Sequence, residues 1–124
     1  MIQRFFGGLL VIVLAASTAQ AAPGDPVQGM QIYQRCRLCH SIEHDLVGPR
    51  HLGLFGRKAG SIVGYPYSSA MKSSGITWSE DTLNQFLSGP QAFVPGTRMT
   101  FTGLPNEQDR ADVIAYLKEA TKPK

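Results

Sequence analysis

The sequence has few residues that could cross-link a small protein. Its 124 residues contain only two cysteines, Cys36 and Cys39, and three histidines. A structural zinc site would need a second pair of ligands at similar spacing, and His44 and His51 are single and misplaced for that role. A disulfide between Cys36 and Cys39 would close a very small, strained loop of little structural value. The chain therefore needs another source of stability.

The sequence also lacks a large excess of charge, internal repeats and low-complexity tracts. Its formal net charge is +3, and the expected loss of Arg4 with a leader segment lowers it to +2. Such a small excess is not typical of a nucleic-acid-binding protein. We expect no nucleic-acid partner.

Only one apolar run is long enough to suggest a membrane-spanning segment or an export signal. Residues 5–16 are mainly apolar, Arg4 precedes them, and Ala19-Gln20-Ala21 follows with the small-x-small pattern of a cleavage site. The run is too short to span a bilayer comfortably. We expect a cleavable Sec signal peptide over residues 1–21 and a single mature domain over residues 22–124 in the periplasm, without membrane insertion. The alternative is an uncleaved anchor.

No stretch of the mature chain alternates at period two, so strands are not expected. Helix signals predict three helices separated by long loops. The first begins at Pro26 after the cap Asp25, with Val27, Met30 and Tyr33 on its apolar face. The second follows Ser79 and stops at Gly89-Pro90, and the third follows Asn106. A weaker turn is expected over residues 68–74. The fold class is therefore all-α, and its loops need something to pack against.

The segment Cys36-Arg37-Leu38-Cys39-His40 matches the Cys-x-x-Cys-His pattern of c-type haem attachment. On a helix, two positions three apart face the same way, so both thiols can reach one edge of a porphyrin. A thioredoxin-like site would need a preceding strand, which is not expected here. A secreted chain with this pattern favours one covalent haem c over a disulfide.

A second axial ligand would have to come from a distant part of the chain. The candidates are Met30, Met71, Met99, His44 and His51, with the lysines as weaker contenders. Met30 and His44 lie too near the cysteines in sequence, and Met71 is interpreted as packing. Met99 follows the Pro95-Gly96 turn, which can bring an extended loop across the haem face. Met99 is the best candidate.

Five segments in this order resemble those of the class I cytochromes c, in the branch shared by mitochondrial cytochrome c and bacterial cytochromes c2. The resemblance extends over residues 29–121. The segments are CRLCH, VGPRHLGLFGRKAG, SGITWSEDTL, VPGTRMTF and RADVIAYLKEATK.

The resemblance implies a role for each matching residue. Cys36 and Cys39 would form the thioether links, and His40 and Met99 would be the axial iron ligands. The carbonyl of Pro49 would accept a hydrogen bond from the ring of His40. Gly29, Tyr33, Val113 and Tyr116 would lie where the first and last helices cross. Further haem contacts would come from Arg57, Tyr67, Trp78, Thr97 and Phe101, the first three near the propionates.

The sequence departs from the family pattern near the expected methionine ligand. Phe86 stands where most relatives have a tyrosine, and Met71 replaces a common asparagine. Both changes make the pocket more apolar, which alters a property that tunes redox potential. Gln91 and Ala92 replace docking lysines. Arg35, Arg37 and Arg98 remain as candidates for an exposed docking edge, although a charge near +2 gives only modest steering.

The resemblance implies a soluble periplasmic electron carrier, monomeric and not an enzyme, that docks transiently on a redox donor and acceptor. One alternative is a haem subunit or tethered donor of a larger redox enzyme. A second is a peroxidatic or ligand-sensing haem protein in which Met99 is loose, which Phe86 favours. His/Met ligation would give a positive potential and leave no open iron site.

Overall fold

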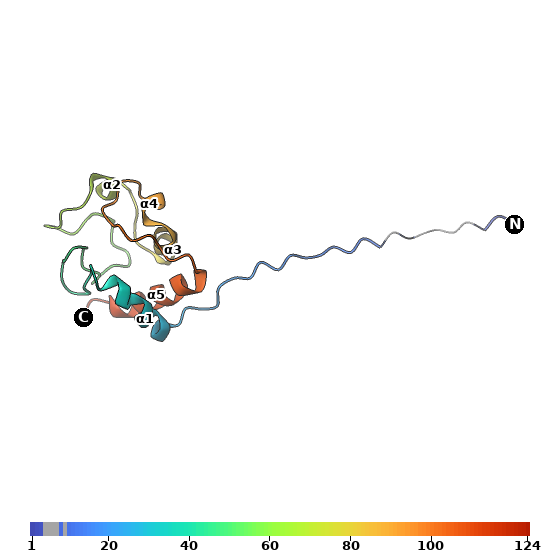
Figure 1. Ribbon diagram of the computed structural model, residues 1–124, viewed down its shortest axis with the longest axis horizontal. Coiled ribbons are helices and arrows are strands. Elements are labelled where there is room, and N and C mark those ends of the chain that lie inside the picture. The colour runs from blue at the N-terminus through green and yellow to red at the C-terminus, as the bar shows by residue number, and fades with distance from the viewer. Residues whose placement is uncertain (4–7, 9) are drawn as a thin grey trace.

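The computed structural model describes residues 1–3, 8 and 10–124, and within these the chain forms helices connected by long loops (Figure 1). There is no strand in the described ranges, only an isolated antiparallel bridge between Lys58 and Thr77. The predicted all-α class is confirmed. The helices are α1 (Pro26–Cys36), α2 (Ser69–Lys72), α3 (Glu80–Ser88), α4 (Pro90–Phe93) and α5 (Glu107–Ala120).

The predicted N-terminal caps are present on all three longer helices. The carboxylate of Asp25 accepts from the N–H of Val27, and the amide oxygen of Asn106 accepts from Asp109. Ser79 forms a reciprocal capping box with Thr82. These bonds satisfy N–H groups that have no partner within the helix, so each helix begins where its cap directs.

Helix α4 was not predicted, because Gly89-Pro90 was interpreted only as the end of α3. Helix α3 does end at Ser88, but Pro90 begins the next short helix. Proline suits the first position of a helix because its missing N–H would be unpaired there in any case. One dipeptide therefore both ends α3 and starts α4.

Helices α1 and α5 lie against each other on one side of the domain (Figure 1). Gly29 makes the close approach possible, since a Cβ there would lie 1.9 Å from the carbonyl oxygen of Asp112. Tyr33 and Val113 at this crossing are 2% and 1% exposed. The predicted apolar face of α1 was partly wrong: Val27 and Met30 are 63% and 42% exposed, because α1 contacts α5 through Gly29 and Tyr33.

Residues 10–20 extend away from the domain (Figure 1) and are exposed without helix or strand. Arg4 and Phe5, where the predicted leader has its basic residue and the start of its apolar run, lie outside the described residues. Within the described part of the chain, no helix has both the length and the apolar character needed to cross a bilayer.

Among the described residues, Ala22 is the first whose main chain bonds to the domain. Its N–H donates to the amide oxygen of Gln108 at 2.8 Å, and its carbonyl accepts from the same side chain at 3.1 Å. Gln108 also donates to the buried carboxylate of Asp112, which accepts the N–H of Asp25. Residue 22 is thus where the extended segment joins the domain.

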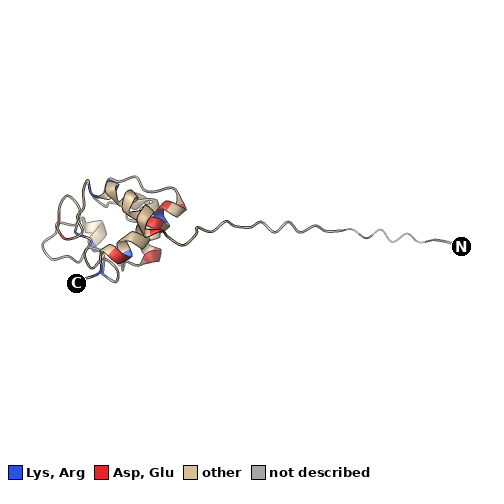
Figure 2. Ribbon diagram, turned by 90° about the horizontal axis from the view of Figure 1, so that it is seen from below, with Lys and Arg blue, Asp and Glu red and all other residues tan. Residues whose placement is uncertain are grey.

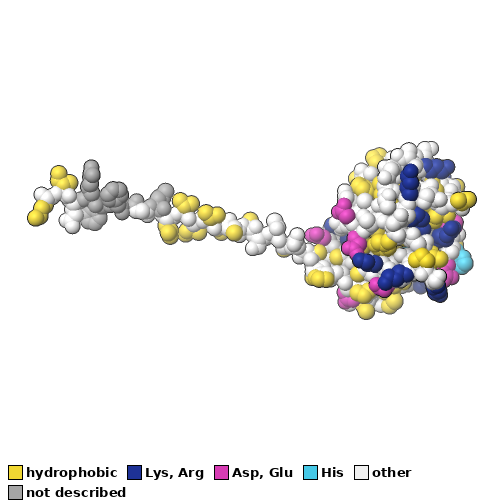
Figure 3. All heavy atoms as spheres, turned by 180° about the vertical axis from the view of Figure 1, so that it is seen from behind, with side chains coloured by type: hydrophobic (Ala, Val, Ile, Leu, Met, Phe, Trp, Pro, Cys, Tyr) yellow, Lys and Arg dark blue, Asp and Glu magenta, His cyan; other side chains and the backbone are white. Residues whose placement is uncertain are grey.

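Charged side chains are scattered over the surface. Acidic residues lie on the first turns of α3 and α5 near the start of the domain (Figure 2). On the face seen in Figure 3, lysines and arginines form several separate groups with apolar and neutral surface between them. This distribution agrees with the small net charge of +3.

Candidate functional site

A cavity of about 330 Å³ lies inside the domain, between the end of α1 and the loops before and after α3. Its volume falls in the range of small-molecule and cofactor sites. Most of its lining is apolar, but several polar groups face it. All nine predicted site residues line it: Cys36, Cys39, His40, Pro49, Arg57, Tyr67, Trp78, Thr97 and Met99.

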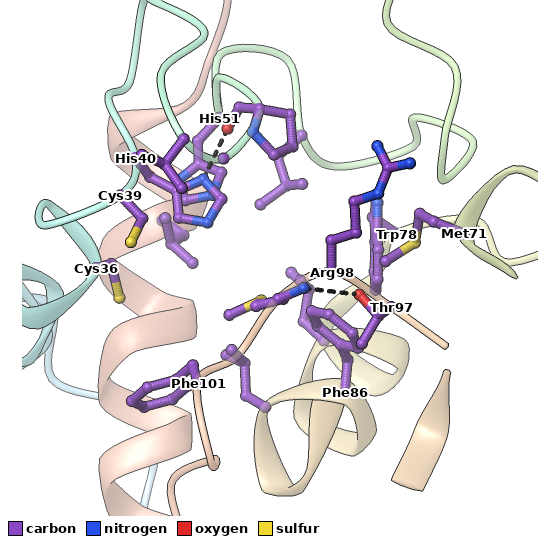
Figure 4. A pocket seen from close by; sticks show the side chains of 18 of the residues that line it. Cys36, Cys39, His40, His51, Met71, Trp78, Phe86, Thr97, Arg98 and Phe101 are labelled. Carbon is purple, nitrogen blue, oxygen red and sulfur yellow. Dashed lines mark hydrogen bonds between the residues drawn. The ribbon is translucent and has the colours of Figure 1, made fainter. Parts of the chain in front are cut away.

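The two cysteines are presented by the C-terminal end of α1. Cys36 is the last helical residue, and its carbonyl accepts from the N–H groups of Cys39 and His40 at 3.1 and 2.8 Å. This tight turn brings Cys36, Cys39 and His40 to one side of the cavity (Figure 4). Burial raises the pKa of the Cys36 thiol, and Cys39 is exposed. Both thiols are free and face the space where a ring could bind.

The ring of His40 is held from its own loop. Its Nδ1 lies 2.7 Å from the carbonyl oxygen of Pro49, which is the contact that the resemblance implies (Figure 4). Gly48 lies directly against the ring, since a Cβ there would be 2.3 Å from Cε1. Burial lowers the pKa of His40, which favours the neutral ring that a metal ligand requires, while the bond to Pro49 opposes this shift. With Nδ1 bonded to a carbonyl, Nε2 is the ring nitrogen that is left to bind a metal ion.

His51 lies beside His40, a contact that the sequence did not reveal. The two ring centroids are 4.2 Å apart with an interplanar angle of 23°, so the rings stack (Figure 4). The Nδ1 atom of His51 lies 3.0 Å from the hydroxyl of Tyr33. Burial, together with His40 and Arg57, lowers the pKa of His51 to about 3. No spacing rule links residues 33, 40 and 51, so the cluster is visible only in the fold.

Met99 lies in a loop held by side chains on both sides. Its N–H donates to the hydroxyl of Thr97 at 3.3 Å, and its carbonyl accepts from Gln91 at 3.0 Å. The neighbouring Arg98 donates to the carbonyl of Pro66 at 2.6 Å. Gly96, with φ of +91°, makes the turn before them. These bonds fix an irregular segment against the cavity.

Three further residues present polar groups at the cavity. The hydroxyl of Tyr67 accepts the N–H of Ile62 at 3.2 Å, which leaves its own hydrogen for another acceptor. Trp78 is 7% exposed, and its indole N–H, which has no hydrogen bond within the described residues, is not fully buried. Arg57 donates to the carbonyls of Leu52 and Arg50 at 2.9 and 3.0 Å, so it braces the loop as well as lining the cavity.

The residues that depart from the family pattern also line the cavity. Phe86 is 6% exposed and packs against Trp78 with ring centroids 5.0 Å apart (Figure 4). Met71, on α2, and Phe101 are partly buried next to the core. The region around Met99 is therefore apolar.

The mouth of the cavity is formed by lining residues that are exposed to solvent. Leu38 and Val47 there are 83% and 77% exposed. Arg35 and Arg98 are the exposed cations among the lining residues. Arg37 does not line this cavity; it borders a separate surface groove with Met30 and His44. The mouth is thus partly apolar with two arginines.

Comparison with known proteins identifies this kind of site. The sequence profile of the Cytochrome c family matches residues 26–121. The chain is 50% identical to cytochrome c2 of Rhodomicrobium vannielii over 107 residues, 84% of this chain and 86% of that protein. It is 47% identical to cytochrome c of Gibberella zeae over 105 residues, 82% of this chain and 99% of that protein. Cytochrome cH from Methylobacterium extorquens aligns with a TM-score of 0.75 and 42% identity, covering 77% of this chain and 99% of that one.

The chain therefore belongs to the cytochrome c family, as a class I c-type cytochrome. Within this class it is similar to both the bacterial cytochromes c2 and the mitochondrial-type cytochromes c. Proteins of this family are electron carriers, not enzymes, and hold one covalent haem c. Cys36 and Cys39 fit the attachment motif, and the apolar cavity beside them fits the ring.

Proposed function

We propose that this cytochrome is a periplasmic one-electron carrier whose haem iron is ligated by His40 and Met99. The observation that carries the proposal is that both residues line one cavity together with Cys36 and Cys39. Bound haem supplies an iron that alternates between Fe(III) and Fe(II), and His/Met ligation favours a positive potential. The chain's part is to hold the ligands, exclude water and present one edge to partners.

His40 is suited to the proximal position because it directly follows Cys39 and is oriented by Pro49. The bond of 2.7 Å from Nδ1 to the Pro49 carbonyl leaves Nε2 as the donor atom. A hydrogen bond of this kind raises the basicity of a ligating imidazole and fixes its tautomer. Cys36 and Cys39 would form the two thioether links next to it.

Met99 is favoured over the other candidates by position. Met30 and His44 border a different groove. His51 stacks on His40, so it lies on the same side of the cavity as the proximal ligand. Met71 lines the cavity from the short helix α2, whereas Met99 belongs to a loop fixed by Thr97 and Gln91. A fixed loop can hold a weak thioether ligand in place.

Polar groups at the cavity would hold the haem propionates. Tyr67 has a free hydroxyl hydrogen and Trp78 an indole N–H without a protein acceptor, and both are otherwise buried. Each can donate to a carboxylate while its ring fills the core. Arg57 adds positive charge, and Thr97 acts mainly by holding the Met99 loop. Phe101 would cover the methionine side.

The open mouth would be the edge where a redox donor and acceptor dock transiently on a monomer. Leu38 and Val47 give an apolar contact, and Arg35 and Arg98 orient an acidic partner. The +2 charge of residues 22–124 gives little long-range steering. Docking should therefore depend mainly on short-range contact.

Export by a cleaved leader is supported by where the domain begins. Residues 10–20 are exposed, and Ala22 is the first of the described residues that is bonded to α5, through Gln108. Cleavage after Ala21 would remove only residues outside the domain. This proposal places the mature protein, residues 22–124, in the periplasm.

The proposed ligation is tested with Met99→Ala and a matched control, Met71→Ala. Met99→Ala should keep the covalent haem but lose the red-region band of methionine sulfur bound to ferric haem. Its potential should fall by on the order of 0.1 V, a fraction of the range of about 0.8 V that axial ligands set. Met71→Ala should keep the band. The measurement is a redox titration followed by absorbance.

Loss of the band in Met71→Ala with retention in Met99→Ala would identify Met71 as the ligand instead. The unmodified protein gives a second result from the same titration. A missing band at neutral pH would favour the ligand-sensing alternative. The apolar Phe86 beside the cavity favours the same alternative.

A further inference from the structure

His51 has a place in the structure that simple filling of the core does not explain. Its ring stacks on that of His40, with centroids 4.2 Å apart and planes 23° apart (Figure 4). Both rings line the cavity. We infer that His51 is a positioning residue that sets the plane of the His40 imidazole. The inference rests on the proposed ligation by His40.

Two other restraints act on His40, the backbone of Gly48 against part of the ring and the bond to Pro49. The bond from Nδ1 to the Pro49 carbonyl fixes the direction of the ring edge. Hydrogen bonds to carbonyl oxygens tolerate a broad range of angles, so this bond alone permits tilting of the ring plane. A second ring packed face to face on the imidazole opposes that tilt. The hydrogen bond and the stack therefore restrain different motions.

His51 can act in this way because its own position is fixed. The hydroxyl of Tyr33 lies 3.0 Å from Nδ1 of His51, and Tyr33 is 2% exposed. Burial raises the pKa of Tyr33 far above its usual range, so its hydroxyl stays protonated. We assign this hydroxyl as the donor and Nδ1 as the acceptor, because no other acceptor for the hydroxyl lies in the described chain. The proton of His51 is then on Nε2.

The main chain of His51 is held as well. Its N–H donates to the carbonyl of Ser41 at 3.1 Å, and its carbonyl accepts from the N–H of Leu54 at 2.9 Å. Ser41 directly follows His40, so this bond ties the backbones of the two histidines together. Tyr33 in turn packs against Tyr116 of α5, with ring centroids 5.2 Å apart. The stack is therefore connected to the α1–α5 crossing.

The plane of an axial imidazole has an effect that can be measured without any partner protein. In low-spin ferric haem this plane, together with the orientation of the second axial ligand, determines how unpaired spin is distributed over the porphyrin. The order and spread of the haem methyl proton resonances report that distribution. A residue that only fills space would change stability without changing this pattern.

The test compares His51→Leu, His51→Phe and the control His44→Leu in the holoprotein. Leu is similar in bulk but has no planar ring, so the methyl pattern and the potential should both shift. Phe keeps a ring for stacking but loses the bond to Tyr33, so its methyl pattern should shift less than that of His51→Leu. Its thermal midpoint should fall, because the Tyr33 hydroxyl loses its acceptor. His44 is exposed beside another groove, so His44→Leu should change neither the methyl pattern nor the thermal midpoint.

An unchanged methyl pattern in His51→Leu, or an equal change in the Leu and Phe variants, would overturn the inference. Tyr33→Phe leaves both rings in place and gives an independent measurement should the His51 variants yield no holoprotein. It removes the bond that holds His51 but keeps the stack, so it should shift the methyl pattern by less than His51→Leu does, and no shift would count against the inference. The methionine band, recorded in every sample, reports separately whether the proposed ligation holds.

Discussion

At the scale of single residues, two glycines fix distances that no other residue would permit. A Cβ at Gly29 would lie 1.9 Å from the Asp112 carbonyl oxygen, and one at Gly48 would lie 2.3 Å from Cε1 of His40. Both distances are far below van der Waals contact. The first glycine sets the spacing of α1 and α5, and the second sets the place of the His40 ring. Neither glycine has a positive φ. Glycine is therefore required at both positions because a side chain would not fit, and not because of the backbone conformation.

Gly29→Ala should destabilise the protein although alanine favours helices. The helical preference for Ala over Gly is about 1 kcal/mol, whereas crowding at a tight contact costs about 1–3 kcal/mol or more. The overlap is with the backbone of α5, which cannot move away alone. We expect the free energy of unfolding in denaturant to fall by about 2 kcal/mol.

Gly89→Ala is the control for this change. Its Cβ would meet only the Cβ of Ala92, at 3.6 Å, and its φ of −173° suits any residue. Its stability should stay within about 0.5 kcal/mol of the wild type. A Gly29→Ala protein as stable as this control would show that the helices separate without cost.

Some of these residues could be predicted from sequence and others could not. Cys36, Cys39 and His40 are adjacent along the chain, so their spacing alone indicates haem attachment. The resemblance then led to Pro49 and Met99, which lie at the same cavity. His51 was considered only as a distant ligand candidate, because its contact with His40 depends on the path of the loop between them. Local patterns do not encode such a path.

At the scale of elements, helix boundaries were predictable where a side chain caps the backbone. Asp25, Ser79 and Asn106 each accept the hydrogen bond that their position predicts. The buried face of α1 was less predictable. Apolar periodicity ranked Val27 and Met30 above Gly29, but a glycine without a side chain makes the closest contact. Periodicity counts side chains and cannot detect a contact between backbones.

The N-terminal segment gives a prediction about processing. The exported protein should begin at Ala22, which N-terminal sequencing or the mass of the holoprotein would show. Ala21→Tyr should block cleavage, because the site requires a small residue there, whereas Gln20→Tyr at the tolerant middle position should not. A periplasmic protein that begins at Met1 would instead support a retained anchor.

At the scale of the whole molecule, the cavity of about 330 Å³ occupies the place of a core. It is lined by residues from α1, α2, α3 and α5 and from the loops over residues 37–68 and 94–106. Without a bound ring, the apolar side chains that line this space would lack packing partners, and a typical small domain has a net stability of only about 5–15 kcal/mol.

Replacing both cysteines, as Cys36→Ala with Cys39→Ala, should therefore abolish stable haem attachment and leave the helices poorly packed. Near-ultraviolet circular dichroism of Trp78 should lose its fixed signal, while some helical far-ultraviolet signal persists. The control is Cys36→Ala alone, which should keep one thioether link and a folded domain. A haem-free double variant with cooperative unfolding would show that the chain folds without the ring.

The bond between His40 and the Pro49 carbonyl also has a kinetic consequence. Electron transfer requires the atoms around the iron to adjust to each oxidation state, and the energy of that adjustment limits the rate. The ring is already bonded at 2.7 Å to a proline carbonyl, with the backbone of Gly48 directly beside it. If His40 is the ligand, it has little freedom to move between the two states. The loop would thus lower the reorganisation energy of electron exchange without contacting any partner.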